Sequence, residues 1–325
     1  MLLTRGNEVT LDASCFLCVV MLRTIILLII TLIALPIIAF QYDTPLNAAQ
    51  WEALQTSFFL MLGVALTCFV ASELTKNYSQ VDKIWSIVPL AYAWFFAQQS
   101  GWNLRLVIMA ILVSLWALRL TYNFARRGGY HWIPWKGEED YRWAVLRQNP
   151  LFQKRINWIL FGLFFISLYQ NTLIWLFNLP IVVAWEGADR HLNGLDFTAI
   201  LLFLGLLVME YIADQQQYDF QTEKYRRINA GEPLTGEYAQ GFCSTGLWRL
   251  MRHPNYTAEQ GIWLSYYLFS VAATGRWLNW SLTGGILLVL LFLGSSDFSE
   301  KISSDKYPDY AEYQKKTPRF LPFRF

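Results

Sequence analysis

The chain alternates long apolar runs with shorter polar segments, and this alternation predicts a membrane protein. Eight runs approach the roughly 20 mostly apolar residues that a helix needs to cross a bilayer. They cover residues 24–40, 51–72, 84–98, 103–122, 157–183, 195–213, 258–275 and 280–296. The third is short enough to be re-entrant, and the fifth is long enough to tilt or to break at Pro180. The pattern predicts an all-α fold, a polytopic bundle of about seven or eight transmembrane helices.

Basic residues are distributed unevenly between the two sides of these predicted helices. If the N-terminus is cytoplasmic, the outer connections contain only Arg105, Arg190 and Arg276, and the other 23 of the 26 Lys and Arg residues lie on the cytoplasmic side or at its boundary. An excess of Lys and Arg is typical of cytoplasmic loops. We therefore expect an integral, multi-pass protein in contact with membrane lipids, with both termini in the cytoplasm. The membrane is a bacterial inner membrane or the endoplasmic reticulum.

Three polar segments lie on the expected cytoplasmic side, at residues 123–155, 216–257 and 297–325. They mix charged with aromatic residues, whereas flexible linkers are rich in Gly and Ser, so we expect them to fold over the mouth of the bundle. Residues 1–50 are interpreted as a leader plus the first membrane helix, and residues 51–325 as one membrane domain. If the apolar run near residue 24 is not a true span, the bundle has seven helices.

Composition excludes several function classes. Hydrophobic residues make up 55% and charged residues 15% of the chain, whereas soluble domains are about a quarter charged. The 26 basic residues nearly balance the 24 acidic ones, which argues against a nucleic-acid partner. The three histidines and four cysteines show no metal-ligand spacing, and we interpret the Cys15-x-x-Cys18 spacing as incidental. Neither a Rossmann turn nor a P-loop motif occurs.

The stretch at residues 252–260 is the first candidate for a functional site. Thr257 and Gln260 have the spacing of a capping box, which predicts a helix start there. With Arg252 and His253 just ahead, such a helix end would suit a phosphate or a carboxylate, although a well-capped cytoplasmic boundary would look the same. Glu259 is one turn inside the span, where a carboxylate normally requires a partner.

A second candidate is Asp82, which precedes the third apolar run. Ser79 and Asp82 could simply cap that helix, with Lys83 reaching the headgroups. Alternatively, burial in an apolar mouth could keep the carboxyl group protonated, so that it donates a hydrogen bond to a substrate oxygen. The sequence alone does not decide between these two interpretations.

Further charged residues lie at the ends of the fourth and sixth apolar runs. Arg119 is inside an apolar helix and should pair with another group, while Arg126 could contact anionic lipid or the phosphates of a dinucleotide. Glu210 and Asp214 are four residues apart and so share a helix face. Two carboxylates on one face favour a polar cavity over contact with lipid.

Four stretches occur together in order: Val81–Ser86, Arg119–Gly129, Arg252–Tyr256 and Lys306–Tyr310. In this combination the chain resembles the DUF1295 branch of the steroid 5-alpha-reductase family, over roughly residues 55–325. Isoprenylcysteine carboxyl methyltransferases are similar at the Arg-His-Pro-Asn-Tyr stretch alone. The resemblance implies a helical membrane enzyme that uses NADPH to reduce a carbon–carbon double bond conjugated to a ketone in a steroid-like or other lipid substrate.

The resemblance also implies roles for individual residues. An acid and a tyrosine polarise the substrate carbonyl in such reductases, and Asp82 stands at the place of the acid. The place of the tyrosine falls on Trp116, which cannot relay a proton as a phenol can, so that Tyr122 or Tyr92 would substitute. This departure argues against a steroid substrate in particular.

The implied cofactor contacts are Arg119, Asp219, Arg226, Asn255, Tyr256 and Glu259, to which the local chemistry adds Arg126, Arg252 and His253. No arginine occurs between residues 277 and 318, where a contact to the 2′-phosphate is expected, and this makes NADH conceivable. Two other functions stay open: a methyltransferase that uses S-adenosylmethionine, and a non-catalytic membrane protein that binds lipid.

Overall fold

The computed structural model describes residues 33–133 and 137–322. Every regular element in these ranges is a helix, which confirms the predicted all-α fold. The chain divides into two compact units, Met1–Pro45 and Leu46–Phe325. In the first unit, α2 (Leu35–Gln41) has a proline in its first turn. The proposed leader, the Cys15-x-x-Cys18 motif and residues 24–32 of the first predicted span lie outside the described residues.

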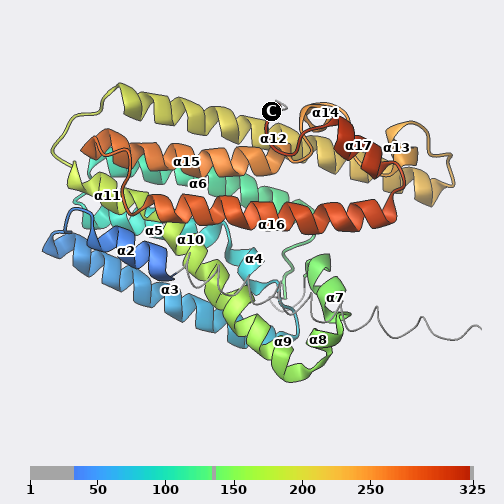
Figure 1. Cartoon of the computed structure of the whole chain (residues 1–325), viewed down its shortest axis with the longest axis horizontal. Coiled ribbons are helices and arrows are strands. Elements are labelled where there is room, and N and C mark those ends of the chain that lie inside the picture. Colours follow the sequence, from blue (N-terminus) through green and yellow to red (C-terminus); the bar gives the residue numbers. More distant parts are fainter. Residues whose placement is uncertain (1–32, 134–136, 323–325) are drawn as a thin grey trace, which may run out of the picture. The chain divides into compact units, whose positions relative to one another are not determined.

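In the second unit, helices run back and forth along one common direction (Figure 1). The crossing segments are α3 (Ala48–Thr75), α5 (Ile87–Gln99), α6 (Leu104–Arg126), the succession α9 (Arg155–Phe161), η2 (Gly162–Tyr169), α10 (Gln170–Asn178) and α11 (Pro180–Glu186), then α12 (Gly194–Ala230), α15 (Pro254–Thr274) and α16 (Leu282–Lys306). Short helices occupy the connections at one end: α4 (Gln80–Ile84), α7 (Tyr141–Arg147), α8 (Pro150–Gln153), α13 (Glu237–Gln240), α14 (Leu247–Leu250) and α17 (Tyr310–Lys316).

Five of the crossing segments are long and apolar enough to span a membrane: α3, α6, the succession α9–α11, α12 and α16. The third predicted span is represented by α5, whose 13 residues extend about 20 Å, less than the roughly 30 Å of a bilayer core. The seventh is represented by α15, which is more polar because it contains Glu259 and Gln260. It tolerates these residues because it packs against α11, α12 and α16, and two thirds of its residues are buried. The structure is that of a polytopic helical membrane protein.

The fifth predicted span is interrupted, as its length suggested. Helix α10 ends at Asn178, and Pro180 begins α11, because proline lacks the N–H that a continuous helix would use at this position. A second irregularity was not expected from the sequence: residues Gly162–Tyr169 form a π-helix. Such wider turns are rare and frequently occur at functional sites.

The three arginines of the expected outer connections gather at one end of the unit. Arg105 forms a fully buried ion pair with Asp196, with 2.8 Å between Nε and Oδ1. Arg190 donates to the carbonyl oxygen of Ala273 at 3.1 Å, and Arg276 pairs with Glu186 at 2.6 Å. The three polar segments gather at the opposite end, as the charge distribution predicted. We call this opposite end the polar end.

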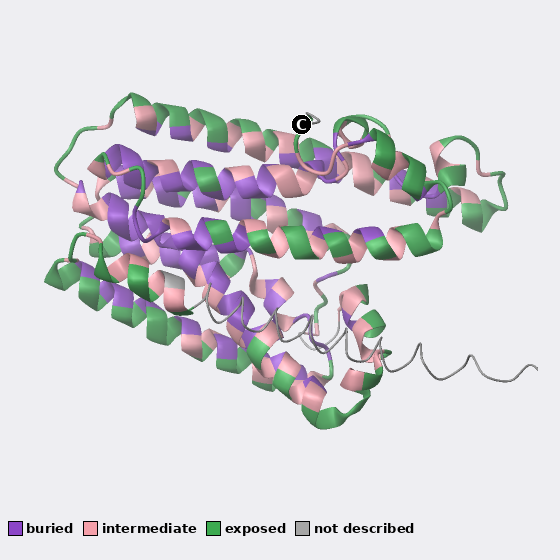
Figure 2. Ribbon diagram, in the orientation of Figure 1, coloured by how far each residue is buried: buried purple, intermediate pink, exposed green. Residues whose placement is uncertain are grey.

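Two glycines permit close helix contacts near the centre of the unit. A Cβ atom on Gly261 of α15 would lie 2.8 Å from Leu206 of α12, and one on Gly284 of α16 would lie 2.3 Å from the backbone of Leu176 in α10. Small residues let helices approach closely inside a membrane, where association depends on packing rather than on the hydrophobic effect. Figure 2 shows that α15 and the neighbouring part of α10–α11 are the most buried segments, whereas α3 and α12 expose much of their surface.

Candidate functional site

A buried ionic cluster lies where α6, α12 and α15 meet. The guanidinium of Arg119 lies 2.9 Å from Glu210, 2.6 Å from Asp214 and 3.5 Å from Glu259. All four side chains are less than a tenth exposed. The partner that the sequence required for Arg119 is therefore a set of three carboxylates, two of them contributed by one face of α12. We call these four residues the ionic cluster.

Glu259 is held by two indole rings in addition to Arg119. Trp116 donates to Oε2 at 2.8 Å, and Trp263, one turn along α15, donates to Oε1 at 3.0 Å. The two rings pack edge to face, with 5.0 Å between their centroids. Hydrogen bonds to an ionised carboxylate are stronger than those between neutral groups. The burial of a carboxylate on α15 is explained by this set of donors.

Side-chain amides extend the cluster toward the polar end. Asn123 donates to Asp214 at 2.9 Å, and the amide of Asn255 lies 3.5 Å from the other oxygen of the same carboxylate. Arg126 donates to Asn123 and to Gln215, and its guanidinium stacks over the ring of Tyr218 at 4.3 Å. These contacts join α6, α12 and the start of α15.

The ionic cluster contains more acid than base. One guanidinium faces three carboxyl groups, and Oε2 of Glu210 and Nε of Arg119 are buried without a hydrogen-bond partner among the described residues. Unpaired charge is costly in a medium of low dielectric constant. The arrangement can therefore bind a further hydrogen-bond donor at Glu210 and a further acceptor at Arg119.

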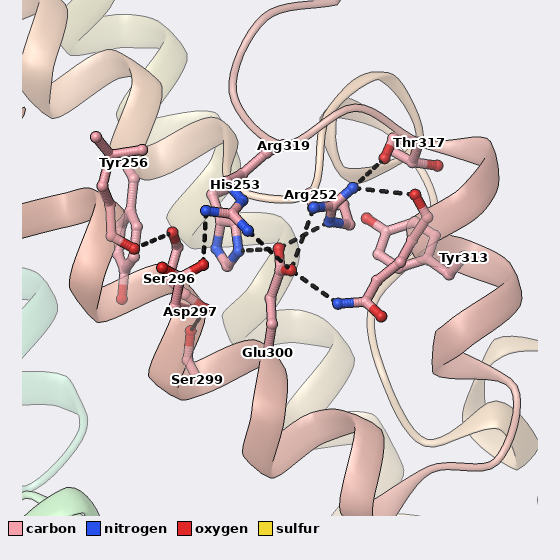
Figure 3. A network of polar contacts seen from close by, with 12 residues as sticks. Arg252, His253, Tyr256, Ser296, Asp297, Ser299, Glu300, Tyr313, Thr317 and Arg319 are labelled. Carbon is pink, nitrogen blue, oxygen red and sulfur yellow. Dashed lines mark hydrogen bonds and ion pairs between the residues drawn. The ribbon is translucent and has the colours of Figure 1, made fainter. Parts of the chain in front are cut away.

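Arg252 and His253 belong to a second network, centred on Glu300 of α16 (Figure 3). Arg252 donates to both oxygens of Glu300, at 2.7 and 3.2 Å, and Nε2 of His253 lies 2.8 Å from Oε1. Gln314 donates to Oε2 at 2.8 Å. The remaining nitrogen of Arg252 donates to the backbone carbonyls of Gln314 and Thr317. The anion that the sequence led us to expect beside these two residues is thus a carboxylate of the chain itself.

The C-terminal segment is tied to the start of α15 by the same network. The backbone N–H groups of Arg252 and His253 donate to the carbonyls of Pro318 and Arg319, at 2.9 and 3.1 Å. Arg319 also pairs with Asp297 at 2.8 Å. Helix α15 begins at Pro254 rather than at Thr257, so the predicted capping box is wrong: Thr257 bonds instead to the carbonyls of His253 and Phe320. Proline is well suited to the first turn of a helix, because its missing N–H is not needed there.

Asp82 lies in the short helix α4, outside the membrane-spanning segments. The interpretation of Ser79 and Asp82 as side-chain caps is not borne out, because neither α4 nor α5 has a capping hydrogen bond from a side chain. The hydroxyl of Ser79 instead accepts from the backbone N–H of Asp140 at 2.9 Å. Burial raises the pKa of the Asp82 carboxyl to about 6, and its Oδ2 atom has no hydrogen-bond partner among the described residues.

The charged residues near Asp82 come from the first turns of α7. Arg142 pairs with Asp140 at 2.6 Å and donates to Ser295 of α16 at 3.0 Å. Both Asp140 and Arg142 interact electrostatically with Asp82. They also interact with Tyr256, which in turn interacts with Asp214 of the ionic cluster. Tyr256 itself stacks on His253, with 5.1 Å between the ring centroids.

The other predicted site residues are more scattered. Tyr122 is 57% exposed on α6, close to the guanidinium of Arg126. Arg226 is paired with the half-buried Glu223 and the exposed Glu232, and lies 12 residues beyond Asp214, which is about 18 Å along the helix. Asp219 is exposed and accepts from Gln215 at 2.7 Å. Among the described hydrogen bonds and ion pairs, none joins Asp82 to Trp116 or Tyr122.

The sequence did not identify Asp140 and Arg142 as residues of a site. Arg142 and Asp140 lie in a polar connection whose sequence gave only a mixture of charge and aromatic residues. The Asp-x-Arg spacing at the start of a short helix is common and says nothing about Asp82 or Tyr256, because both are far away in the sequence. Among the described residues, no group of three or more His, Cys, Asp or Glu side chains has the geometry to hold a metal ion.

Comparison with known proteins places these residues in a wider group. Residues 68–317 match a family model described as a protein of unknown function (DUF1295). The chain is also 41% identical, over 261 residues, to an uncharacterised protein of Schizosaccharomyces pombe. The aligned residues cover 76% of this chain and 73% of the relative. No solved structure matches the chain.

Proposed function

Because the chain belongs to the DUF1295 family, we propose that it is a membrane-embedded reductase that uses NADPH to saturate a carbon–carbon double bond conjugated to a carbonyl group in a lipid. The resemblance of four short stretches to the steroid 5-alpha-reductase family supplies this chemistry. The observation that carries the proposal is that residues from all four stretches gather at the polar end. Ser86 contacts Thr121 at 2.6 Å, Arg119 lies beside α15, and Tyr310 interacts electrostatically with Arg252.

In this proposal Asp82 is the acid. A carboxyl group with a pKa of about 6 is partly protonated near neutral pH and can donate its O–H to a carbonyl oxygen. That hydrogen bond withdraws electron density from the conjugated double bond and so favours addition at the β-carbon. Over the whole reaction one hydride and one proton are added, which converts the enone into the saturated ketone. Trp116 is assigned no direct contact with the substrate, because its N–H is engaged by Glu259.

The ionic cluster and its neighbours fit the polar parts of a dinucleotide. Bound NADPH would supply the hydride. The unpaired Oε2 of Glu210 can accept a hydrogen bond from an amide group, and the amide of Asn255 is held only by a long contact to Asp214. Arg126 and the exposed Arg127, at the end of α6, suit phosphate oxygens. Arg252 and His253 have a positioning role, since Glu300 engages both.

Cofactor binding tests this proposal and separates it from the alternatives. The protein purified in detergent should gain thermal stability with NADPH, by about 2.7 kcal/mol at a hundredfold excess over the dissociation constant. NADH and S-adenosylmethionine are measured in parallel. A gain with S-adenosylmethionine alone would identify a methyltransferase, and no gain with any of the three would favour a non-catalytic lipid-binding protein. Oxidation of NADPH in the presence of long-chain enones, followed by the loss of the absorbance of the reduced cofactor, then tests the reaction itself.

A variant pair makes the test specific for the proposed site. Asn255→Ala should weaken NADPH binding and leave the fold intact, because Asn255 makes only the long contact to Asp214 and a local bond to the N–H of Tyr256. Asn157→Ala removes an amide at the same end, on α9, that bonds to the carbonyl of Leu151. It should bind NADPH as the unchanged protein does. Equal affinities for the two variants would exclude the Asn255 side of the ionic cluster as the cofactor site.

A further inference from the structure

Three buried polar groups lie together between α3 and the segment formed by η2 and α10. They are the hydroxyls of Ser72 and Ser167 and the side-chain carbonyl of Asn171, and each residue is 1% exposed. The Oγ atoms of both serines and Oδ1 of Asn171 have no hydrogen-bond partner among the described residues. Buried polar groups are nearly always hydrogen-bonded, so several unpaired groups at one place require an explanation.

Cys68 connects these groups to Asp82. It lies four residues before Ser72, so the two side chains share a face of α3. The thiol interacts with the side chain of Asn171 and with the charge of Asp82. Asn171 donates to the backbone carbonyl of Ser167 at 2.8 Å, which places these two residues on one face as well. Helix α3 packs against η2, α10 and α4 (Figure 1). Asp82, in the neighbouring α4, has an unpaired and buried Oδ2 atom of its own, and its charge reaches Cys68 in this place.

The backbone is irregular at this place. Ser167 lies within the π-helix Gly162–Tyr169, whose wider turn changes the direction of the side chains that follow it. An α-helix of the same apolar residues would have been less costly, and π-turns persist mainly where they serve a site. The irregular segment and the unpaired groups thus coincide, although neither observation depends on the other.

The chemistry of the four groups indicates what they bind. Two hydroxyls and a carboxyl group with its proton are donors, and Oδ1 of Asn171 is an acceptor that can orient one of the hydroxyls. The helical segments that carry Ser72, Ser167 and Asn171 are otherwise mostly apolar, so a charged ligand would be disfavoured. An oxygen atom attached to an apolar body, as in a ketone of a lipid, matches both properties.

We propose that Ser72, Ser167 and Asn171 form, together with Asp82, a subsite that binds the carbonyl oxygen of the lipid substrate. The oxygen accepts one hydrogen bond from the Asp82 carboxyl and one from a serine hydroxyl. This subsite supplies the second donor that Trp116 cannot supply, because the indole of Trp116 is bonded to Glu259. The identification of the ligand as a substrate rests on the proposed reductase function, whereas the binding of a ketone does not.

The test measures binding of a ketone that cannot be reduced. The probe is 2-hexadecanone, and hexadecane is the comparison without oxygen; the thermal midpoint of the detergent-purified protein is followed as a function of probe concentration. The unchanged protein should bind 2-hexadecanone at least tenfold more tightly than hexadecane. Ser72→Ala should lose that preference, and its midpoint without probe should rise, because the variant removes a buried hydroxyl that has no partner. Retention of the full preference in Ser72→Ala would overturn the proposal, as would an equal response of the unchanged protein to the two probes.

Asn171 and Asn178 provide a matched pair. Both lie on α10, both are buried, and each donates to the carbonyl four residues earlier at 2.8 Å while its Oδ1 is unpaired. Asn171→Leu should lose the preference for the ketone, and Asn178→Leu, seven residues away, should keep it. The same result for both variants would contradict the subsite. If the ketone preference is confirmed but no enone supports NADPH oxidation, the subsite stands and the reductase function fails.

Discussion

The indole N–H of Trp116 donates to Oε2 of Glu259 at 2.8 Å and so joins α6 to α15. Both residues are buried, and Trp263 completes the arrangement from the other side of the carboxylate. Trp116 occupies the place at which the family resemblance implied a tyrosine that touches the substrate. In this chain the corresponding side chain instead fixes a carboxylate of the ionic cluster.

Replacing Trp116 by Phe should therefore act mainly on stability. The variant leaves Oε2 of Glu259 with Arg119 at 3.5 Å as its remaining ionic partner, and the loss of a hydrogen bond to a charged group should cost about 1.5–3 kcal/mol. Trp94→Phe is the control, because Trp94 donates to the neutral hydroxyl of Ser114 at 3.0 Å, and about 1 kcal/mol is expected there. Thermal unfolding in detergent measures both. Lost turnover with unchanged stability would instead assign Trp116 to the substrate.

The excess of acid in the ionic cluster leads to a second prediction. Asp214→Asn should destabilise the protein by about 1.5–3 kcal/mol, because Asp214 accepts hydrogen bonds from both Arg119 and Asn123. Glu210→Gln should be close to neutral or stabilising, because it removes one negative charge from a cluster that holds three carboxyl groups and one guanidinium. Denaturation midpoints of the two variants compare directly. A larger loss for Glu210→Gln than for Asp214→Asn would contradict this account of the charges.

Asp82 should give the activity a pH dependence. Its pKa is raised by burial to about 6, so the fraction that is protonated falls as the pH rises through 6, and turnover of an enone should fall with it. Asp82→Asn should have low turnover at every pH between 5 and 8, with its NADPH affinity unchanged. Asp309→Asn, an exposed residue beside α17, should retain the profile. Unchanged turnover of Asp82→Asn would remove this residue from the mechanism.

The raised pKa of Asp82 also makes the folding stability of the protein depend on pH. The folded state holds the proton of Asp82 more tightly than the unfolded state, so its favourable contribution is complete below about pH 4 and is lost as the pH rises from there through about 6. At pH 8 the ionised group costs up to about 3 kcal/mol, since one pKa unit corresponds to about 1.4 kcal/mol. Asp82→Asn should therefore be more stable than the unchanged protein at pH 8 and gain little at pH 4.

The sequence predicted the crossing helices well because the length of an apolar run is a local property. The break at Pro180 followed from local chemistry too, as did the common face of Glu210 and Asp214. The start of α15 was misplaced because Thr257 and Gln260 imitate a capping box, whereas Pro254 and the returning C-terminal segment set the actual start. The π-helix depends on how η2 packs against α3, which no local pattern records.

The partners within the candidate site depend on contacts between distant residues. Arg119 needed a partner, but Glu259 lies 140 residues further along the chain, and one sequence cannot show that they meet. Arg252 and His253 were predicted to lie beside a phosphate or a carboxylate, and in the structure both contact a carboxylate of the chain itself. The anion proved to be Glu300, which in the sequence is one acidic residue among several in a polar helix end.

The side of the membrane on which the polar end lies can be measured by cysteine labelling. Lys316 is exposed on α17 at the polar end, and Trp277 is 67% exposed at the opposite end. If the excess of basic residues marks the cytoplasmic side, a membrane-impermeant maleimide should label Trp277→Cys in intact cells and Lys316→Cys only after lysis. Labelling is compared with the parent chain, which has its own four cysteines. The reverse pattern would place the polar end outside.

Glu300 should control how firmly the C-terminal segment is attached. It holds Arg252, His253 and Gln314 at 2.7–2.8 Å. The carbonyls of Pro318 and Arg319 accept from the backbone N–H groups of Arg252 and His253, just before α15. Glu300→Gln removes the charge that these donors share, so residues 317–320 should separate from α15 more often. Trypsin should then cleave after Lys316 and Arg319 severalfold faster, and a small loss of thermal stability should accompany it. Glu223→Gln also breaks a set of arginine pairs, but at the exposed end of α12, and its cleavage rate at the C-terminus should equal that of the unchanged protein. Equal rates for both variants would show that the segment is held by its backbone hydrogen bonds and not by Glu300.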